Sequence, residues 1–197
     1  GKVIIPAFSV GRTQEIVYSL HRLANTHELP DIPIYVDSPL AVGATEIFRL
    51  HPECYDEELE DFVAQDRHPD PFGFERLRYI RNVEDSKALN RLDGPAVIIS
   101  ASGMCEAGRI QHHLKHNVGD PRSTVLIVSW QAPHTLGRRL VERQDTVKIF
   151  GEKRRRTGCP QPHVSEFECP VAQVFHQFAV HGRYGHKHRT FKWFLLL

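Results

Sequence analysis

Residues 1 to 150 alternate between short, almost continuous apolar runs and longer segments in which apolar residues recur at helical spacing. The apolar runs occupy residues 3–8, 32–38, 96–100 and 124–130. Between the first two runs, one helical face collects Ile16, Val17, Leu20, Leu23 and Ala24. Strands buried on both faces have few polar positions, and parallel strands need crossover connections, usually helices. The alternation therefore predicts an α/β fold, with a mainly parallel sheet covered by helices on both faces.

The remaining sequence predicts further helices and strands in the same alternation. Further helices are expected at 41–50, 55–63, 85–92, 108–116 and 135–142. Further strands are expected at 76–80 and 146–150. The acidic run at 56–61 is most simply the solvated face of a helix.

The composition is that of an ordinary globular protein, with 41% hydrophobic and 25% charged residues among 197. The apolar runs are far shorter than the roughly 20 residues that span a bilayer, so no membrane-spanning segment is expected. The opening residues GKVIIPAF have no secretory pattern and predict a chain that begins inside a larger protein. The four cysteines form no CxxC pair, which favours neither a zinc knuckle nor a disulfide framework. A cytoplasmic location is therefore expected.

Charge is distributed unevenly along the chain. Residues 151–197 carry eight Lys and Arg against three Glu, whereas the preceding residues are acidic overall. Beyond residue 152 the sequence is rich in Arg, His, Cys and Pro and has no clear period. A basic tail can bind nucleic acid, but a solvated, poorly ordered terminus is the favoured interpretation of 153–197. A shifted reading frame is a second explanation for the change.

Three of the predicted strands end in small polar residues. The first runs into Ser9 and Gly11, the second into Asp37 and Ser38, and the strand at 96–100 into Ser100, Ser102 and Gly103. In open α/β sheets, ligands gather outside the carboxyl ends of the strands. Backbone N–H groups at helix N-termini attract anions there. A shared phosphate-binding crevice is the hypothesis, and tight turns with helix caps are the alternative.

Charged residues follow the same three turns. Arg12 and Arg109 begin the helices after two of them, where a guanidinium can grip a phosphate with two hydrogen bonds. Taken alone, each arginine is more often a surface residue or a partner for an acid such as Glu15. For Asp37 a general base is conceivable, but a helix cap or a hydrogen-bonding role in the cleft wall is favoured.

Four ordered motifs resemble one family. They are PAFSVGRTQEIVYSL at 6–20, IPIYVDSPLA at 32–41, SASGMCEAGRIQHHLKH at 100–116, and VLIVSWQAPHTLGRRLVE at 125–142 followed by VKIFGE at 147–152. Together they closely resemble the β-CASP branch of the metallo-β-lactamase fold, which contains RNA-processing nucleases. The resemblance implies a β-CASP domain at 1–122 and a return segment of the metallo-β-lactamase core at 123–152. One departure is Pro133-His134, where the family usually has a glycine.

The family hydrolyses RNA with two zinc ions, so the resemblance implies a zinc ribonuclease as the intact parent. The family's HxHxDH zinc motif precedes the β-CASP domain, and this sequence contains no such motif. His181, in Val-His-Gly, matches a later ligand motif but lacks the Ser-Gly/Ala-His that should precede it. His112 and His116 have chelating spacing but no third ligand, so surface or phosphate-facing roles are favoured. No zinc ion is expected to bind this fragment tightly.

The leading hypothesis is a fragment of a β-CASP ribonuclease, inactive alone, that grips RNA in the cleft. The expected RNA-binding residues are Arg12, Ser38, Ser100, Ser102, Gly103 and Arg109, with Asp37 as a cleft neighbour. RNA and the missing metallo-β-lactamase core are the expected partners, and a homodimer is possible. The alternatives are a non-catalytic nucleic-acid-binding or scaffolding module, and an enzyme acting on a phosphorylated metabolite.

Overall fold

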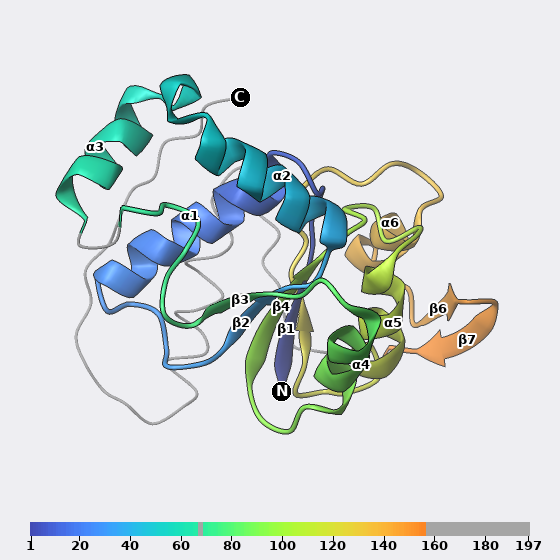
Figure 1. Cartoon of the computed structure of the whole chain (residues 1–197). Helices are drawn as coiled ribbons and strands as arrows, with labels where there is room; N and C mark the ends of the chain where they lie inside the picture. The colour runs from blue at the N-terminus through green and yellow to red at the C-terminus, as the bar shows by residue number, and fades with distance from the viewer. Residues whose placement is uncertain (67–68, 157–197) are drawn as a thin grey trace.

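A computed structural model of the chain describes residues 1–66 and 69–156. Its centre is a five-stranded parallel sheet in the order β3-β2-β4-β1-β5 (Figure 1). The strands are β1 Lys2–Pro6, β2 Ile34–Val36, β3 Leu77–Tyr79, β4 Ala96–Ser100 and β5 Thr124–Val125. The predicted α/β fold with a parallel sheet is confirmed.

Helices connect the strands. They are α1 Arg12–Asn25, α2 Pro39–Leu50, the 3₁₀ turn η1 Pro52–Cys54, α3 Glu57–Gln65, α4 Val83–Arg91, α5 Arg109–Asn117 and α6 Leu136–Val141. An antiparallel hairpin of β6 Thr146–Ile149 and β7 Glu152–Arg155 follows α6. Figure 1 shows α1, α2 and α3 together on one side, with α4, α5, α6 and the hairpin on the other. No described helix has both the length and the apolar character to cross a membrane.

Each face of the sheet has its own core. Alternate residues of β1 point to opposite faces: Val3 and Ile5 pack with the apolar face of α1, and Ile4 packs with α5. The predicted stripe on α1 is confirmed, since Ile16, Val17 and Leu20 are buried and Leu23 and Ala24 pack against the same cluster. Each fully buried aliphatic side chain contributes about 1.5–3 kcal/mol to stability. The helices thus cover both faces, as the sequence predicted.

The strand expected at 124–130 is wrong in length. Only Thr124 and Val125 pair with β1, and the N–H of Leu126 donates the last ladder bond, 2.9 Å from the carbonyl of Ile4. The next residue of β1 that faces this neighbour is Pro6, which has no N–H to donate. The ladder therefore stops there, because a proline cannot continue it.

The hairpin is anchored by one face of β6. Val147 and Ile149 are buried in the cluster that contains residues of α5 and α6, and the alternate residues Thr146 and Lys148 are exposed. In the turn before α6, His134 has a φ of 70°, a left-handed conformation that favours glycine. This is the position where the sequence departs from the family pattern. Thr135 then caps α6 through the N–H of Arg138 at 3.2 Å.

Candidate functional site

The three polar turns meet at one edge of the sheet. β2, β4 and β1 are adjacent and parallel, so their carboxyl ends lie side by side. The turn after β1 touches the turn after β2, because the Ser9 and Ser38 Oγ atoms are 3.1 Å apart. The turn after β4 is tied in through Ser100, whose Oγ donates to the carbonyl of Asp37 at 2.8 Å. We call these three turns the strand-end site.

Ser38 begins α2. Its Oγ accepts from the N–H of Ala41 at 3.2 Å, and Pro39 occupies the first helical position. Both features favour a helix start, since the hydroxyl satisfies a free N–H and proline needs none there. The helix cap is therefore Ser38, and the capping role considered for Asp37 is wrong. Ser38 is largely buried, which leaves little of its hydroxyl open to a ligand.

Asp37 is the centre of a buried hydrogen-bond network. One carboxylate oxygen accepts from His113 Nε2 and Ser86 Oγ, both at 2.6 Å, and the other accepts from Arg109 Nη1 at 2.7 Å. The side chain is fully shielded from solvent. Burial alone would raise the pKa of Asp37, but the hydrogen bonds from His113, Ser86 and Arg109 outweigh it and lower the pKa below 3.8. Asp37 therefore has hydrogen-bonding partners, as predicted, whereas its place in the wall of a cleft stays a prediction.

Both helices on this face contribute to the network. Ser86 and Asn90 lie four residues apart on α4, while Arg109 and His113 lie four apart on α5. His113 Nε2 donates to the carboxylate, which can only accept, and its Nδ1 is 2.8 Å from Asn90 Oδ1. The imidazole ring is therefore held at both nitrogens, and α4 and α5 are fixed to the end of β2.

Arg109 is engaged within the protein. Besides Asp37, it donates to the carbonyl of Ile80 at 3.4 Å and, through Nη2, to the carbonyl of Arg81 at 2.8 Å. Its side chain is 18% exposed. By contrast, Arg12 is 45% exposed and pairs with Glu15 at 2.6 Å, the partner that the sequence had suggested. Of the two arginines, Arg12 is the one accessible to a ligand.

The turn after β4 is built on glycines. A Cβ on Gly103 would lie 2.9 Å from the ring of Phe8, and one on Gly108 would lie 2.7 Å from the carbonyl oxygen of Ala101. Gly108 also has a φ of 82°, which disfavours other residues. Ser102 is partly exposed, and its N–H donates to Ala107 at 3.1 Å. The turn therefore lies close to Phe8 and keeps the Ser102 side chain near the surface.

Sequence reasoning missed Ser86, Asn90 and His113. The i, i+4 spacing of Ser86 with Asn90 and of Arg109 with His113 was the available signal, whereas the prediction named only His112 and His116. His112 instead packs near Phe150, with ring centroids 4.6 Å apart, and His116 is exposed. His181 lies outside the described residues.

A zinc site does not fit the described residues. No group of three or more His, Cys, Asp and Glu side chains in them is placed to hold a metal ion. Asp37 and His113, the best donor pair, already use both carboxylate oxygens and both ring nitrogens within the protein. Zinc takes three or four protein ligands, so this network is not a metal centre.

Several known proteins are similar to this chain in sequence. Ribonuclease TTHA0252 of Thermus thermophilus is 41% identical over 153 residues, which cover 78% of this chain and 35% of that protein. A transcription termination factor FttA of Methanosarcina mazei is 31% identical, covering 77% of this chain and 24% of that protein. An RNase J-like protein of Methanocaldococcus jannaschii is 32% identical over a match that covers 78% of this chain and 34% of that protein. The chain spans about a third or less of the length of these relatives.

A family model described as the Beta-Casp domain matches residues 13–140, well over half of the chain. This range contains α1 from its second residue, the five-stranded sheet apart from β1, and the turns after β2 and β4. The chain belongs to the Beta-Casp domain family.

Proposed function

We propose that this chain is the RNA-contacting part of an RNA-cleaving hydrolase, and that the strand-end site contacts RNA phosphates. The observation that carries the proposal is the meeting of three polar turns at the carboxyl edge of β2, β4 and β1. Such edges are where open α/β sheets bind ligands. The names of the relatives, ribonuclease and RNase J-like protein, support RNA as the ligand.

Within the strand-end site, the accessible groups would make the contacts. Arg12 offers a guanidinium that is 45% exposed, and Ser9 and Ser102 are partly exposed at the turns. Arginine binds phosphate with two parallel hydrogen bonds, and hydroxyls add single ones. Ser38, Ser100 and Gly103 are buried, so they act by shaping the turns. Arg109 acts as a positioning residue through Asp37.

Catalysis is proposed for the intact parent and not for this chain alone. Two zinc ions would supply an activated water and a clamp on the phosphate. Their ligands would come from the metallo-β-lactamase core, because the described residues do not fit a zinc site. We therefore expect this chain to bind RNA without cleaving it. A cytoplasmic location and a homodimer also remain proposals.

A scaffolding or binding module without catalysis is the second candidate. The transcription termination factors among the relatives favour keeping it, because their printed name does not specify RNA cleavage. The two candidates separate in the full-length parent supplied with zinc. Cleavage of RNA supports the hydrolase, and binding without cleavage supports the module.

The strand-end site is tested with a pair of variants in one ion pair. Arg12→Ala should weaken the binding of a fluorescein-labelled single-stranded RNA several-fold at low salt, because a phosphate contact is lost. Glu15→Gln should strengthen binding, because it removes the carboxylate that holds Arg12 at 2.6 Å. Both side chains are exposed, so the fold should be unaffected. Unchanged binding by both variants would contradict the assignment.

A further inference from the structure

The outer face of the β6–β7 hairpin carries a row of cations. The register places Lys148 directly opposite Lys153 and Thr146 opposite Arg155, and all four residues are exposed. Because side chains alternate along a strand, these four share one face, while Val147 and Ile149 are buried on the other. We call Lys148, Lys153 and Arg155 the basic hairpin face.

Within the part of the chain that the structure describes, no ion pair balances the charges on this face. The only acid on the two strands is Glu152, which already pairs with Lys115 at 2.9 Å and Arg154 at 2.5 Å. Across the described ranges 1–66 and 69–156, no ion pair involves Lys148, Lys153 or Arg155. Like charges directly opposite each other destabilise a strand pair. A bound polyanion would relieve that repulsion.

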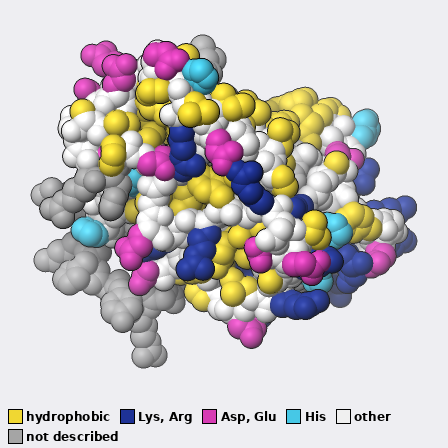
Figure 2. All heavy atoms as spheres, viewed as in Figure 1, with side chains coloured by type: hydrophobic (Ala, Val, Ile, Leu, Met, Phe, Trp, Pro, Cys, Tyr) yellow, Lys and Arg dark blue, Asp and Glu magenta, His cyan; other side chains and the backbone are white. Residues whose placement is uncertain are grey.

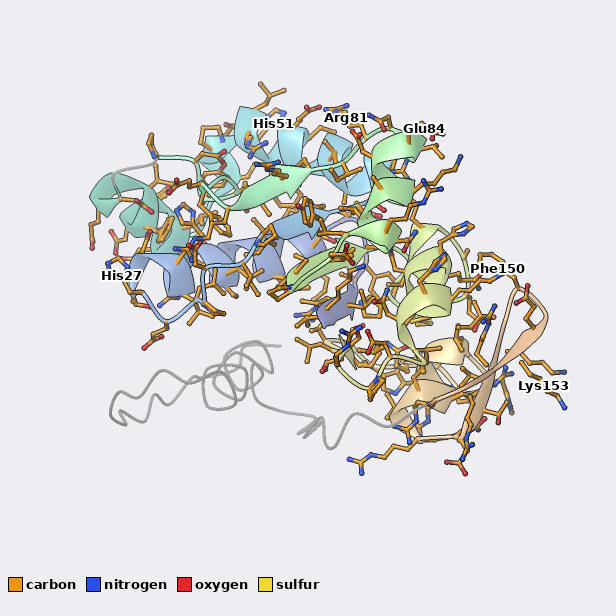
Figure 3. All side chains as sticks on the ribbon, turned by 90° about the horizontal axis from the view of Figure 1, so that it is seen from below. His27, His51, Arg81, Glu84, Phe150 and Lys153 are labelled. Atoms are coloured by element: carbon orange, nitrogen blue, oxygen red, sulfur yellow. The ribbon has the colours of Figure 1, made fainter. Side chains whose placement is uncertain are left out.

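The hairpin is also placed apart from the strand-end site. Figure 1 shows it extending to the side, beyond α5 and α6. Figure 2 shows Lys and Arg side chains gathered in the same part of the molecule. In Figure 3 the side chain of Lys153 lies at the outer part of the hairpin, pointing away from the sheet. The face is therefore open to a long ligand.

From this geometry we infer that the basic hairpin face is a second RNA contact, which binds the phosphate backbone of a strand that also reaches the strand-end site. Lys153 and Arg155 are two residues apart on β7, about 7 Å along the strand, and Lys148 lies beside Lys153 on the neighbouring strand, so the three cations form a patch that suits successive phosphates. Lysine and arginine contacts to phosphate carry no base information, so this contact adds affinity without sequence preference. The inference rests on the proposed RNA-binding function.

The test compares two triple variants of the full chain that lose the same charge. Lys148→Gln/Lys153→Gln/Arg155→Gln removes all three positive charges of the basic hairpin face. Arg78→Gln/Lys87→Gln/Arg91→Gln removes three exposed cations from β3 and α4 and serves as the control. Binding of a labelled single-stranded RNA is measured by anisotropy over a range of salt concentrations. Thermal melts verify that both variants are folded.

The hairpin variant should bind about 10- to 100-fold more weakly at 0.1 M salt, and the slope of log K against log salt should fall by about 2. The control triple should keep most of the slope. A conservative variant, Lys148→Arg/Lys153→Arg/Arg155→Lys, should bind like the wild type. The effect should be equal for RNAs of different sequence.

Two failures are distinguishable. If the wild type binds RNA and Arg12→Ala weakens it, but the two triple variants behave alike, the second contact is overturned and the strand-end proposal stands. If the wild type does not bind RNA even at low salt, both proposals fall. Equal weakening by the two triple variants would show a general effect of charge and no specific contact at the hairpin.

Discussion

Asp37 and His113, 76 residues apart in the chain, are joined by a 2.6 Å hydrogen bond, and neither side chain is accessible to solvent. Arg109 completes the arrangement from the same helix as His113. The carboxylate at the end of β2 is thereby fixed to α5, and α5 to the turn after β4. The network thus fixes the turns after β2 and β4 relative to each other, which keeps the strand-end site in shape.

Replacing Asp37 should test the network directly. Asp37→Asn removes the carboxylate charge that pairs with Arg109 and leaves the guanidinium, which is only 18% exposed, without its charged partner. Breaking a buried pair in this way costs about 3–5 kcal/mol in the free energy of unfolding. Urea denaturation measures the loss. The exposed Glu84→Gln serves as the control and should change stability by less than about 0.5 kcal/mol. A loss that small for Asp37→Asn would contradict the network.

The same carboxylate predicts how stability depends on pH. The folded-state pKa of Asp37 is lowered below 3.8, against burial, by hydrogen bonds from His113, Ser86 and Arg109. A lowered folded-state pKa contributes stability that is present above the unfolded-state value and is lost as pH falls through the folded-state value. The stability difference between the wild type and Asp37→Asn should therefore shrink below about pH 4. A difference that stays constant down to pH 2.5 would exclude this contribution.

Replacing each of two glycines by alanine should change the free energy of unfolding in opposite directions. At Gly108, alanine should cost roughly 1–3 kcal/mol, because φ is 82° and the new Cβ would lie 2.7 Å from the carbonyl oxygen of Ala101. At Gly43, inside α2, a Cβ meets nothing within 4 Å, so alanine should stabilise by about 0.5–1 kcal/mol. Thermal melts of both variants give the signs. A stabilised Gly108→Ala would refute the tight turn after β4.

Two cysteines should differ in reactivity. Cys105 is fully buried, and burial, reinforced by the negative charge of Glu106, raises its pKa to about 12, so little thiolate forms in the native state. Cys54 is exposed. Iodoacetamide at pH 8, followed by peptide mass spectrometry, should modify Cys54 quickly and Cys105 only after unfolding. Equal rates at the two positions would show that the turn containing Cys105 opens.

The sequence predicted most of the fold because local patterns carry it. The stripe from Ile16 to Ala24 and the apolar runs of β1 and β4 each follow from periodicity, and parallel pairing follows from their alternation. The length of β5 was wrong because it depends on Pro6, which stops the ladder from a strand more than 100 residues earlier.

The candidate site was predicted less completely, for the same physical reason. The turns at Ser38 and Ser102 were found from their composition. The partner of Arg109 was not, because Asp37 lies 72 residues away and only the folded chain brings them to 2.7 Å. His113 was hidden between two more conspicuous histidines. Its spacing from Arg109 was the signal that would have found it.

RNA binding at the strand-end site is tested most directly by an NMR titration of the ¹⁵N-labelled chain with a short single-stranded RNA at low salt. If RNA binds there, the amide resonances of Ser9, Ser38 and Ser102, with those of their turns, should shift together and saturate at one affinity. Resonances of α3, which packs against the C-terminal half of α1 and not near the three turns, should remain in place. Shifts confined to residues outside the three turns, or no shifts at all, would contradict RNA binding at the strand-end site.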